Sequence, residues 1–347
     1  MVIRPAFGHP VPRRAGARAP VTPEAVDFAE IRSRAISRRK TQKLVAAAAG
    51  LVAGAAALIA PPEYRVVLGL GALCGVGYSV LDYLDPKPQA PVFGQRADLA
   101  GAYLEARQPD TTPARRQALF AELQANLETG PAKTSSAVSK SMNEVSLVTL
   151  ENGATALDKP SAGANPKQVR KNILPARAHH REQAAYVVDR WLGHLVGVPP
   201  SVPTPDGLRT LYIPDGQPAL NDPATGWIVS HPERSDYRNL AIFDNVIGNL
   251  DRHRRNYLVL EQGQLVPIDH DLAFPTANQQ QDGGHFEFSE EFALNRHERD
   301  QLEHLLTSRA QVSQELEPLL PTEAIEAMFE RITTMLELGR TYSHWRN

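Results

Sequence analysis

The chain has 347 residues, with 37 lysines and arginines against 39 acidic residues, and a single cysteine, Cys74. This near-neutral balance argues against a protein that binds nucleic acid through its charge. One cysteine excludes an internal disulfide bond and a metal site built from cysteines. The 11 histidines show no metal-binding spacing such as HExxH, so surface or helix-end positions are expected for His179, His180, His297 and His304.

The first part of the chain is basic and then strongly apolar. Residues 1–43 are rich in proline and arginine, which predicts disorder, with a basic helix over Ala25–Lys40. Two uncharged runs follow, Leu44–Ala60 and Val66–Leu81, each near the lower limit of about 17 residues for a membrane span. Their GxxxG spacings let helices approach closely in lipid. We expect a membrane hairpin over residues 44–84, with a soluble buried helical pair as the alternative.

The charges that flank the apolar runs predict how the chain is oriented. Lysine and arginine crowd before the first run, so the N-terminus should face the cytosol, and two passes return the rest of the chain to that side. We therefore expect a membrane-associated protein whose C-terminal part is cytosolic. If this were a secreted bacterial effector, the membrane would be that of a recipient cell.

Residues 85–130 predict a linker followed by a helix. The linker is proline-rich, and Thr112-Pro113 opens a helix that Gly130 stops. An apolar stripe on this helix should pack against the domain that follows; it consists of Ala118, Leu119, Leu123 and Leu127.

A β-hairpin and a helix come next. Ser146 to Leu150 alternate between apolar and polar residues, the turn falls at Asn152-Gly153, and the second strand runs to Lys159. Apolar residues then recur at helical spacing from Ala185 until Pro199-Pro200 ends the helix. Glu182 would lie in the first turn of this helix, where its charge suits the helix dipole.

The stretch from Asn239 to Pro275 predicts chemistry. Asp251 precedes Asn256 by five residues in DRHRRN, and Asp269 ends an apolar strand in VPIDHDLAF. Phosphoryl transfer needs a carboxylate beside the attacking hydroxyl, together with an amide and a second carboxylate that hold Mg²⁺ on the nucleotide. The spacing therefore predicts a kinase that uses ATP and Mg²⁺, with Asp251 as the catalytic residue and Asn256 and Asp269 as metal ligands.

The same stretch resembles the phosphatidylinositol 3-/4-kinase-like superfamily, which includes type II phosphatidylinositol 4-kinases and actin-fragmin kinase. DRHRRN is similar to the family's DRHxxN loop, IDHDLAFP to IDNGLAFP, and FDNVIGNLDRH to FDxLIGNxDRH. The resemblance runs from about Lys133 to the C-terminus. It implies an α+β, two-lobed protein-kinase-like fold over residues 131–347, with a small β-rich lobe before a helical lobe.

The resemblance also implies roles for three further residues. Lys159 matches the strand-ending lysine that binds the nucleotide phosphates, and Glu182 matches the helical glutamate that pairs with it. His253 would share catalysis with Asp251, since the adjacent histidine can act as the base in the lipid kinases, and Arg252 is the alternative for this shared role. A solvent-exposed lysine and a merely dipole-favoured glutamate are the alternatives for the first two residues.

Two departures from the family pattern matter. The segment 131–148, which should cover the phosphates, has no glycine, although a glycine-rich loop would let backbone N–H groups approach the nucleotide. His270 and Asp271 replace the residues that follow the metal-binding aspartate in protein kinases. Asp271 is expected either to cap the next turn or to add a metal ligand.

The C-terminal part predicts helices of a large lobe. Asn295 with Glu298 three residues later forms a capping box, and a second amphipathic helix covers Thr322–Trp345.

The acceptor expected from the sequence is a protein hydroxyl at a membrane surface. The interval from Asn256 to Asn295 contains no lysine or arginine, whereas a highly phosphorylated headgroup would need cations there. Phosphatidylinositol kinase activity on an unphosphorylated headgroup is the alternative. A nucleotide-binding pseudokinase, favoured by the missing glycines, and a membrane scaffold, favoured only by the hairpin, are further alternatives.

Overall fold

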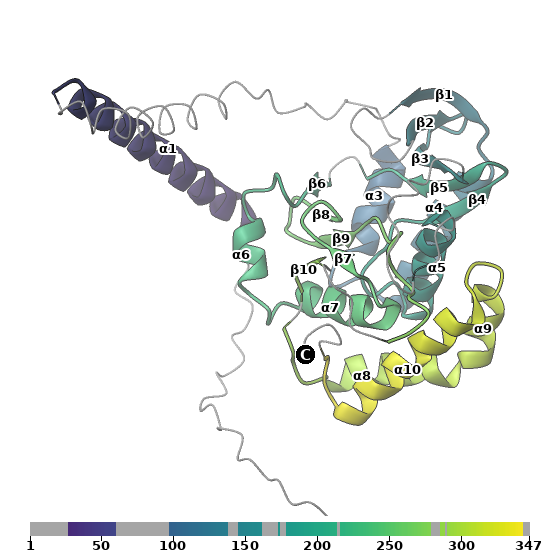
Figure 1. Cartoon of the computed structure of the whole chain (residues 1–347). Helices are drawn as coiled ribbons and strands as arrows, with labels where there is room; N and C mark the ends of the chain where they lie inside the picture. The colour runs from purple at the N-terminus through teal and green to yellow at the C-terminus, as the bar shows by residue number, and fades with distance from the viewer. Residues whose placement is uncertain are drawn as a thin grey trace, which may run out of the picture.

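The computed structural model describes residues 27–59, 97–137, 145–161, 173, 178–213, 216–278, 285–288 and 290–342. These residues form helices and largely antiparallel sheets, so the expected α+β class is confirmed (Figure 1). The sheet of the N-terminal half lies at one end of the body, and the C-terminal helices lie at the other.

A five-stranded antiparallel sheet in the order β1-β2-β3-β5-β4 organises the N-terminal half. Its strands are β1 (Ala132–Ala137), β2 (Ser146–Leu150), β3 (Thr155–Pro160), β4 (Ser201–Thr204) and β5 (Gly207–Leu211). The predicted hairpin is confirmed: Gly153 adopts a positive φ of 85°, which glycine tolerates without strain. The Asn152 Oδ1 accepts a hydrogen bond from the Ala154 N–H at 3.0 Å, which fixes the turn.

Three helices pack beside this sheet: α3 (Ala97–Ala106), α4 (Pro113–Glu128) and α5 (Ala178–Trp191). The predicted start of α4 is confirmed, since the Thr112 side chain accepts from the Arg115 N–H at 3.3 Å and Pro113 follows it. The helix contacts β4 and β5. Its buried side chains are Leu119, Phe120, Leu123 and Leu127.

The helix α5 begins earlier than the sequence pattern suggested. It starts at Ala178, so Glu182 is past the first turn, and the expected benefit from the helix dipole is wrong. The dipole acts mainly on the first turn, so another interaction must hold this buried carboxylate. Within α5, the Asp189 carboxylate accepts from the N–H groups of Val196 and Val198 in the segment after the helix, at 2.9 and 2.8 Å, and fixes the turn toward β4.

The C-terminal half combines short strands with helices. A three-stranded sheet in the order β6-β8-β9 contains β6 (Gln217–Pro218), β8 (Tyr257–Val259) and β9 (Leu265–Pro267), and β7 (Asp251–Arg252) pairs in parallel with β10 (His285–Phe286). The helices are α6 (Thr225–Val229), α7 (Ser235–Ile247), α8 (Arg296–Thr307), α9 (Arg309–Leu316) and α10 (Thr322–Leu338). The capping box of Asn295 and Glu298 is confirmed at the start of α8.

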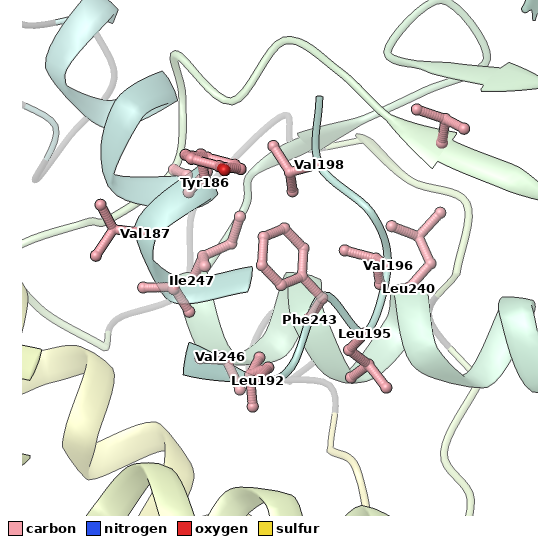
Figure 2. Packing of buried hydrophobic residues seen from close by; sticks show 14 of the residues in the cluster. Tyr186, Val187, Leu192, Leu195, Val196, Val198, Leu240, Phe243, Val246 and Ile247 are labelled. Carbon is pink, nitrogen blue, oxygen red and sulfur yellow. The ribbon is translucent and has the colours of Figure 1, made fainter. Parts of the chain in front are cut away.

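The two halves share one hydrophobic core. Figure 2 shows the Phe243 ring of α7 among side chains from α5 and from the segment after it, including Leu192 and Val196. Phe243 is fully buried. This packing fixes α5 relative to α7, and α7 leads directly into the DRHRRN loop.

The helix α1 (Phe28–Ile59) is a single helix of 32 residues that projects from the body (Figure 1). Its first two turns are packed against the C-terminal half: the Phe28 ring meets Trp227 edge to face at 5.6 Å, and the Arg32 guanidinium contacts the Asp222 carboxylate at 2.9 Å. The basic helix expected from the sequence therefore exists. It is not simply part of a disordered tail, because Phe28 buries its ring.

The membrane hairpin is not confirmed. Its first apolar run continues α1 as far as Ile59, and the second, Val66–Leu81, lies outside the described residues. Among the helices that the structure describes, none has the length and apolar character needed to cross a bilayer.

Candidate active site

Lys159 and Glu182 form an ion pair between β3 and α5. The Lys159 Nζ lies 2.6 Å from the Glu182 Oε1. Burial alone would lower the pKa of Lys159, but the charges of Glu182 and Asp269 outweigh burial and raise it. Burial likewise would raise the pKa of Glu182, but the Lys159 cation and the His270 hydrogen bond lower it. Both groups are therefore charged, and the alternative of a solvent-exposed lysine does not fit this contact.

Asp269 lies beside this pair, just after β9. Its Oδ1 is 3.6 Å from the Lys159 Nζ, and its side chain remains 42% exposed. The backbone of Asp269 has φ of 60°, a left-handed conformation that few residues other than glycine, asparagine and aspartate adopt. The carboxylate is thus held in a specific direction while one side stays accessible, as a ligand of a nucleotide-bound metal requires.

Asp251, His253 and Asn256 lie together in the DRHRRN loop. The Asn256 Nδ2 donates to the Asp251 backbone oxygen at 2.8 Å and lies 3.4 Å from its Oδ2. The His253 Nε2 is 3.7 Å from the same Oδ2. The Asp251 N–H donates to the Asn249 Oδ1 at 3.1 Å, which fixes the start of the loop. The five-residue spacing therefore folds the loop back on itself.

The β8–β9 hairpin connects the two sets of residues. Tyr257 pairs with Pro267, and the Ile268 N–H donates to the Asn256 backbone oxygen at 3.0 Å. Asn256 therefore comes immediately before β8, and Asp269 comes just after its paired strand β9. The pairing places the two predicted metal ligands at the same end of one hairpin.

Arg252 has a structural role in the site, whereas the sequence suggested that it could share catalysis with Asp251. Its guanidinium is 1% exposed and contacts the Asp244 carboxylate at 2.9 Å through both Nε and Nη2. The Nη1 donates to the backbone oxygens of Ile268, at 2.9 Å, and of Asn256. One buried cation thus ties α7 to the chain on both sides of the hairpin. The sequence signal for this ion pair was Asp244, a carboxylate eight residues before Arg252 in FDNVIGNLDRH.

The donor chemistry of Asn256 and Asp269 fits a hard divalent cation. Because the Asn256 Nδ2 is engaged by the Asp251 backbone oxygen, its Oδ1 is the atom left to act as a ligand. Oxygen donors from one amide and one carboxylate, completed by phosphates and water, suit Mg²⁺. Within the described residues there is no cluster of three or more histidine, cysteine, aspartate or glutamate side chains arranged for a metal.

The turn after Asp269 closes through the backbone, with the Ala273 N–H donating to the His270 oxygen at 3.0 Å. Burial, together with the negative charges of Asp269 and Glu182, raises the pKa of Asp271 to about 7. Arg181 binds the Asp271 backbone oxygen. The glycine-poor segment is described only in part: β1 is exposed, and residues 138–144 lie outside the described residues.

Comparison with known proteins agrees with the motifs. The sequence model of the family described as phosphatidylinositol 3- and 4-kinase matches residues 234–311, which contain both the DRHRRN loop and IDHDLAFP. No curated protein sequence gives a significant match. The family match supports a kinase, and it agrees with the resemblance of the two motifs to the phosphatidylinositol 3-/4-kinase-like superfamily of atypical kinases.

Solved structures show weaker likenesses. The chain is 14% identical to hydra Fam20 with sugar, at a TM-score of 0.43, over 63% of this chain and 88% of that one. It is 14% identical to the Golgi casein kinase, at a TM-score of 0.41, over 69% of this chain and 82% of that one. A structure of the Golgi casein kinase with Mn/ADP bound, also 14% identical, gives a TM-score of 0.39 over 63% of this chain and 75% of that one.

Proposed function

We propose that this kinase transfers the γ-phosphoryl group of ATP, bound with Mg²⁺, to a hydroxyl group of a protein. The observation that carries the proposal is the β8–β9 hairpin, which holds Asn256 and Asp269 at one end while Asp269 contacts the paired Lys159. This arrangement gathers a phosphate-binding cation and two metal ligands where the catalytic loop ends, and such positioning is most of what phosphoryl transfer requires.

The proposed roles follow from the contacts. Lys159, held by Glu182, binds the phosphate oxygens, and Asn256 and Asp269 supply oxygen ligands to the cation. When bound, Mg²⁺ neutralises the charge that develops on the phosphates. Asp251 orients the acceptor hydroxyl and takes its proton. The acceptor oxygen then forms a bond to the γ-phosphorus, as the bond from that phosphorus to the bridging oxygen of ADP breaks.

The charges near the catalytic loop favour a protein acceptor over a highly phosphorylated headgroup. Between Asn256 and Asn295 the sequence has no lysine or arginine. The loop's own Arg254 is paired with the Glu287 carboxylate at 2.8 Å, so it is already engaged by an anion. Glu290 is exposed on the same segment. An acceptor with basic residues around its hydroxyl fits these charges best.

An unphosphorylated phosphatidylinositol headgroup is the second candidate acceptor. The family match itself favours it, because the matched model is described as phosphatidylinositol 3- and 4-kinase and includes the LAFP segment, Leu272–Pro275. Such a headgroup carries a single phosphodiester charge, so it needs fewer cations than a phosphorylated one.

Transfer from labelled ATP to matched acceptors tests the proposal. The full chain with Mg²⁺ should label a serine peptide flanked by arginines several-fold faster than the same peptide flanked by glutamates, and faster than phosphatidylinositol in neutral vesicles. A preparation of Asp251→Asn serves as the blank for contaminating kinases. Preferential labelling of the lipid would replace the protein acceptor by the second candidate. Labelling of no acceptor, with ATP bound, would favour the pseudokinase.

We propose further that α1 brings the kinase to the cytosolic surface of an anionic membrane. Arg34, Arg38, Arg39 and Lys40 are exposed on this helix, just before its apolar run. Each basic residue near such a surface contributes about 1 kcal/mol. Reversing the charge at 38, 39 and 40 should therefore weaken binding to phosphatidylserine vesicles by at least about 100-fold. Cosedimentation measures this, with Arg296→Glu on α8 as the control. Equal binding by the two variants would contradict the proposal.

A further inference from the structure

His270 occupies the position after the metal-binding aspartate, and it reaches back to α5. Its side chain is 0% exposed, and its Nδ1 lies 3.0 Å from the Glu182 Oε2. The other oxygen of the same carboxylate, Oε1, contacts the Lys159 Nζ at 2.6 Å. Each oxygen of the Glu182 carboxylate therefore has one contact partner.

The surroundings of the imidazole define which nitrogen carries the hydrogen. The Nε2 is buried and has no hydrogen-bond partner among the described residues, and the ring meets Phe243 edge to face at 5.8 Å. A buried N–H without a partner costs free energy, and a carboxylate oxygen can only accept. The hydrogen is therefore on Nδ1, which donates it to Glu182.

These contacts form a closed cycle of residues in the proposed active site. Lys159 contacts Glu182, Glu182 contacts His270, His270 is bonded covalently to Asp269, and the Asp269 Oδ1 lies 3.6 Å from the Lys159 Nζ. This cycle of contacts joins β3, α5 and the segment after β9. With Lys159 as its only partner, the Glu182 carboxylate could rotate about its last torsion. With both partners it is fixed.

We propose that His270 is a positioning residue that orients Glu182 and, through it, Lys159 toward the nucleotide phosphates. The inference rests on the proposed phosphoryl transfer. It assigns to this chain a polar connection between the phosphate-binding pair and the metal-binding segment. His270 itself contacts neither substrate.

Three substitutions at this position separate positioning from packing. His270→Phe and His270→Leu keep an apolar core residue but cannot donate to Glu182. In His270→Asn, the amide nitrogen lies close to where the imidazole Nδ1 lies, so it can still donate. Removing a group that orients a functional side chain typically costs about 10- to 100-fold in activity. We expect a loss of that size in kcat/KM for the first two variants and a loss of only a few-fold for His270→Asn.

A double-mutant cycle with Glu182→Gln tests whether His270 acts through Glu182. Once Glu182 is replaced, His270→Phe should cause little further loss, because contacting residues that act as a unit are not additive. His194→Asn, which removes another buried imidazole stacked on Phe120, is the control and should leave kcat/KM unchanged. Additive losses, or equal losses in His270→Phe and His270→Asn, would overturn the inference. Thermal unfolding of each variant shows whether the fold is retained.

Binding of a fluorescent ADP analogue provides a readout that needs no phosphoryl transfer. His270→Phe should weaken binding, whereas His270→Asn should restore most of it. If the wild-type chain binds the analogue in this way but labels no acceptor, the proposed function fails and the positioning role stands. If binding is equal in all the variants at this position, the positioning role fails, whatever the transfer assay shows.

Discussion

Replacing Asp251 by asparagine should lower the rate of phosphoryl transfer by about 100- to 10,000-fold, the usual contribution of a positioned general base. Nucleotide affinity should hardly change, because Asp251 faces the acceptor rather than the phosphates. The loop should keep its fold: the contact from the Asn256 Nδ2 is made to the backbone oxygen of Asp251, which the substitution does not remove. Single-turnover transfer from labelled ATP measures the loss.

Two companion variants define what the Asp251 result means. Asp206→Asn, an exposed aspartate in the turn before β5, is the matched control and should transfer phosphate at the wild-type rate. His253→Gln removes the imidazole 3.7 Å from the Asp251 carboxylate. A moderate loss there would mean that the two residues share the proton. Near-normal turnover of Asp251→Asn with native thermal unfolding would show that this aspartate is not the catalytic residue.

Replacing Asp269 by asparagine should abolish the dependence of nucleotide binding on Mg²⁺. The carboxylate is the only charged ligand proposed for the cation, so its loss should weaken binding of an Mg²⁺–ATP analogue by at least about 10-fold. Without Mg²⁺ the affinity should stay the same or rise, since a negative charge near the phosphates is removed. Asparagine also tolerates the positive φ at this position, so strain should not unfold the variant.

Calorimetric titration with and without Mg²⁺ checks this second result. Lys159→Met is the informative comparison, because losing the phosphate-binding cation should weaken binding in both conditions. An Asp269→Asn variant whose affinity still rises normally on adding Mg²⁺ would mean that VPIDHDLAF is an ordinary core strand, with its metal ligand elsewhere.

Local patterns were enough to predict much of the fold. The alternation before Asn152-Gly153, the capping box at Asn295 and the Thr112-Pro113 helix start all depend on neighbours in the chain, and the structure contains each of them. Lys159 and Glu182 were named together only because the sequence resembled a known family. No spacing in the sequence predicts that β3 and α5 meet.

Contacts between distant segments could not be predicted in this way. In the sequence, nothing distinguishes Arg252 from the other charged residues of DRHRRN. Its burial against Asp244 appears only when α7 is folded against the hairpin. The docking of Phe28 joins residues that are about two hundred positions apart in the chain. The membrane hairpin was expected from the length and charge of two runs, of which the structure describes only the first, as part of α1.

Because the start of α1 is docked on the C-terminal half, the packed body of the protein includes residues that precede the first apolar run. Arg32 donates to the backbone oxygens of Leu260 and Glu261, at 2.9 and 2.5 Å, and the Phe28 ring covers Gly263, where an added Cβ would lie 2.2 Å from the ring. These three residues lie in the turn of the β8–β9 hairpin, whose opposite end carries Asn256 and Asp269. A shortened protein that begins after α1 would therefore lack the contacts from Phe28 and Arg32 that hold the turn of this hairpin. In the full chain, α1 is a long helix whose start is anchored to the turn of the β8–β9 hairpin, at the end opposite the proposed metal ligands.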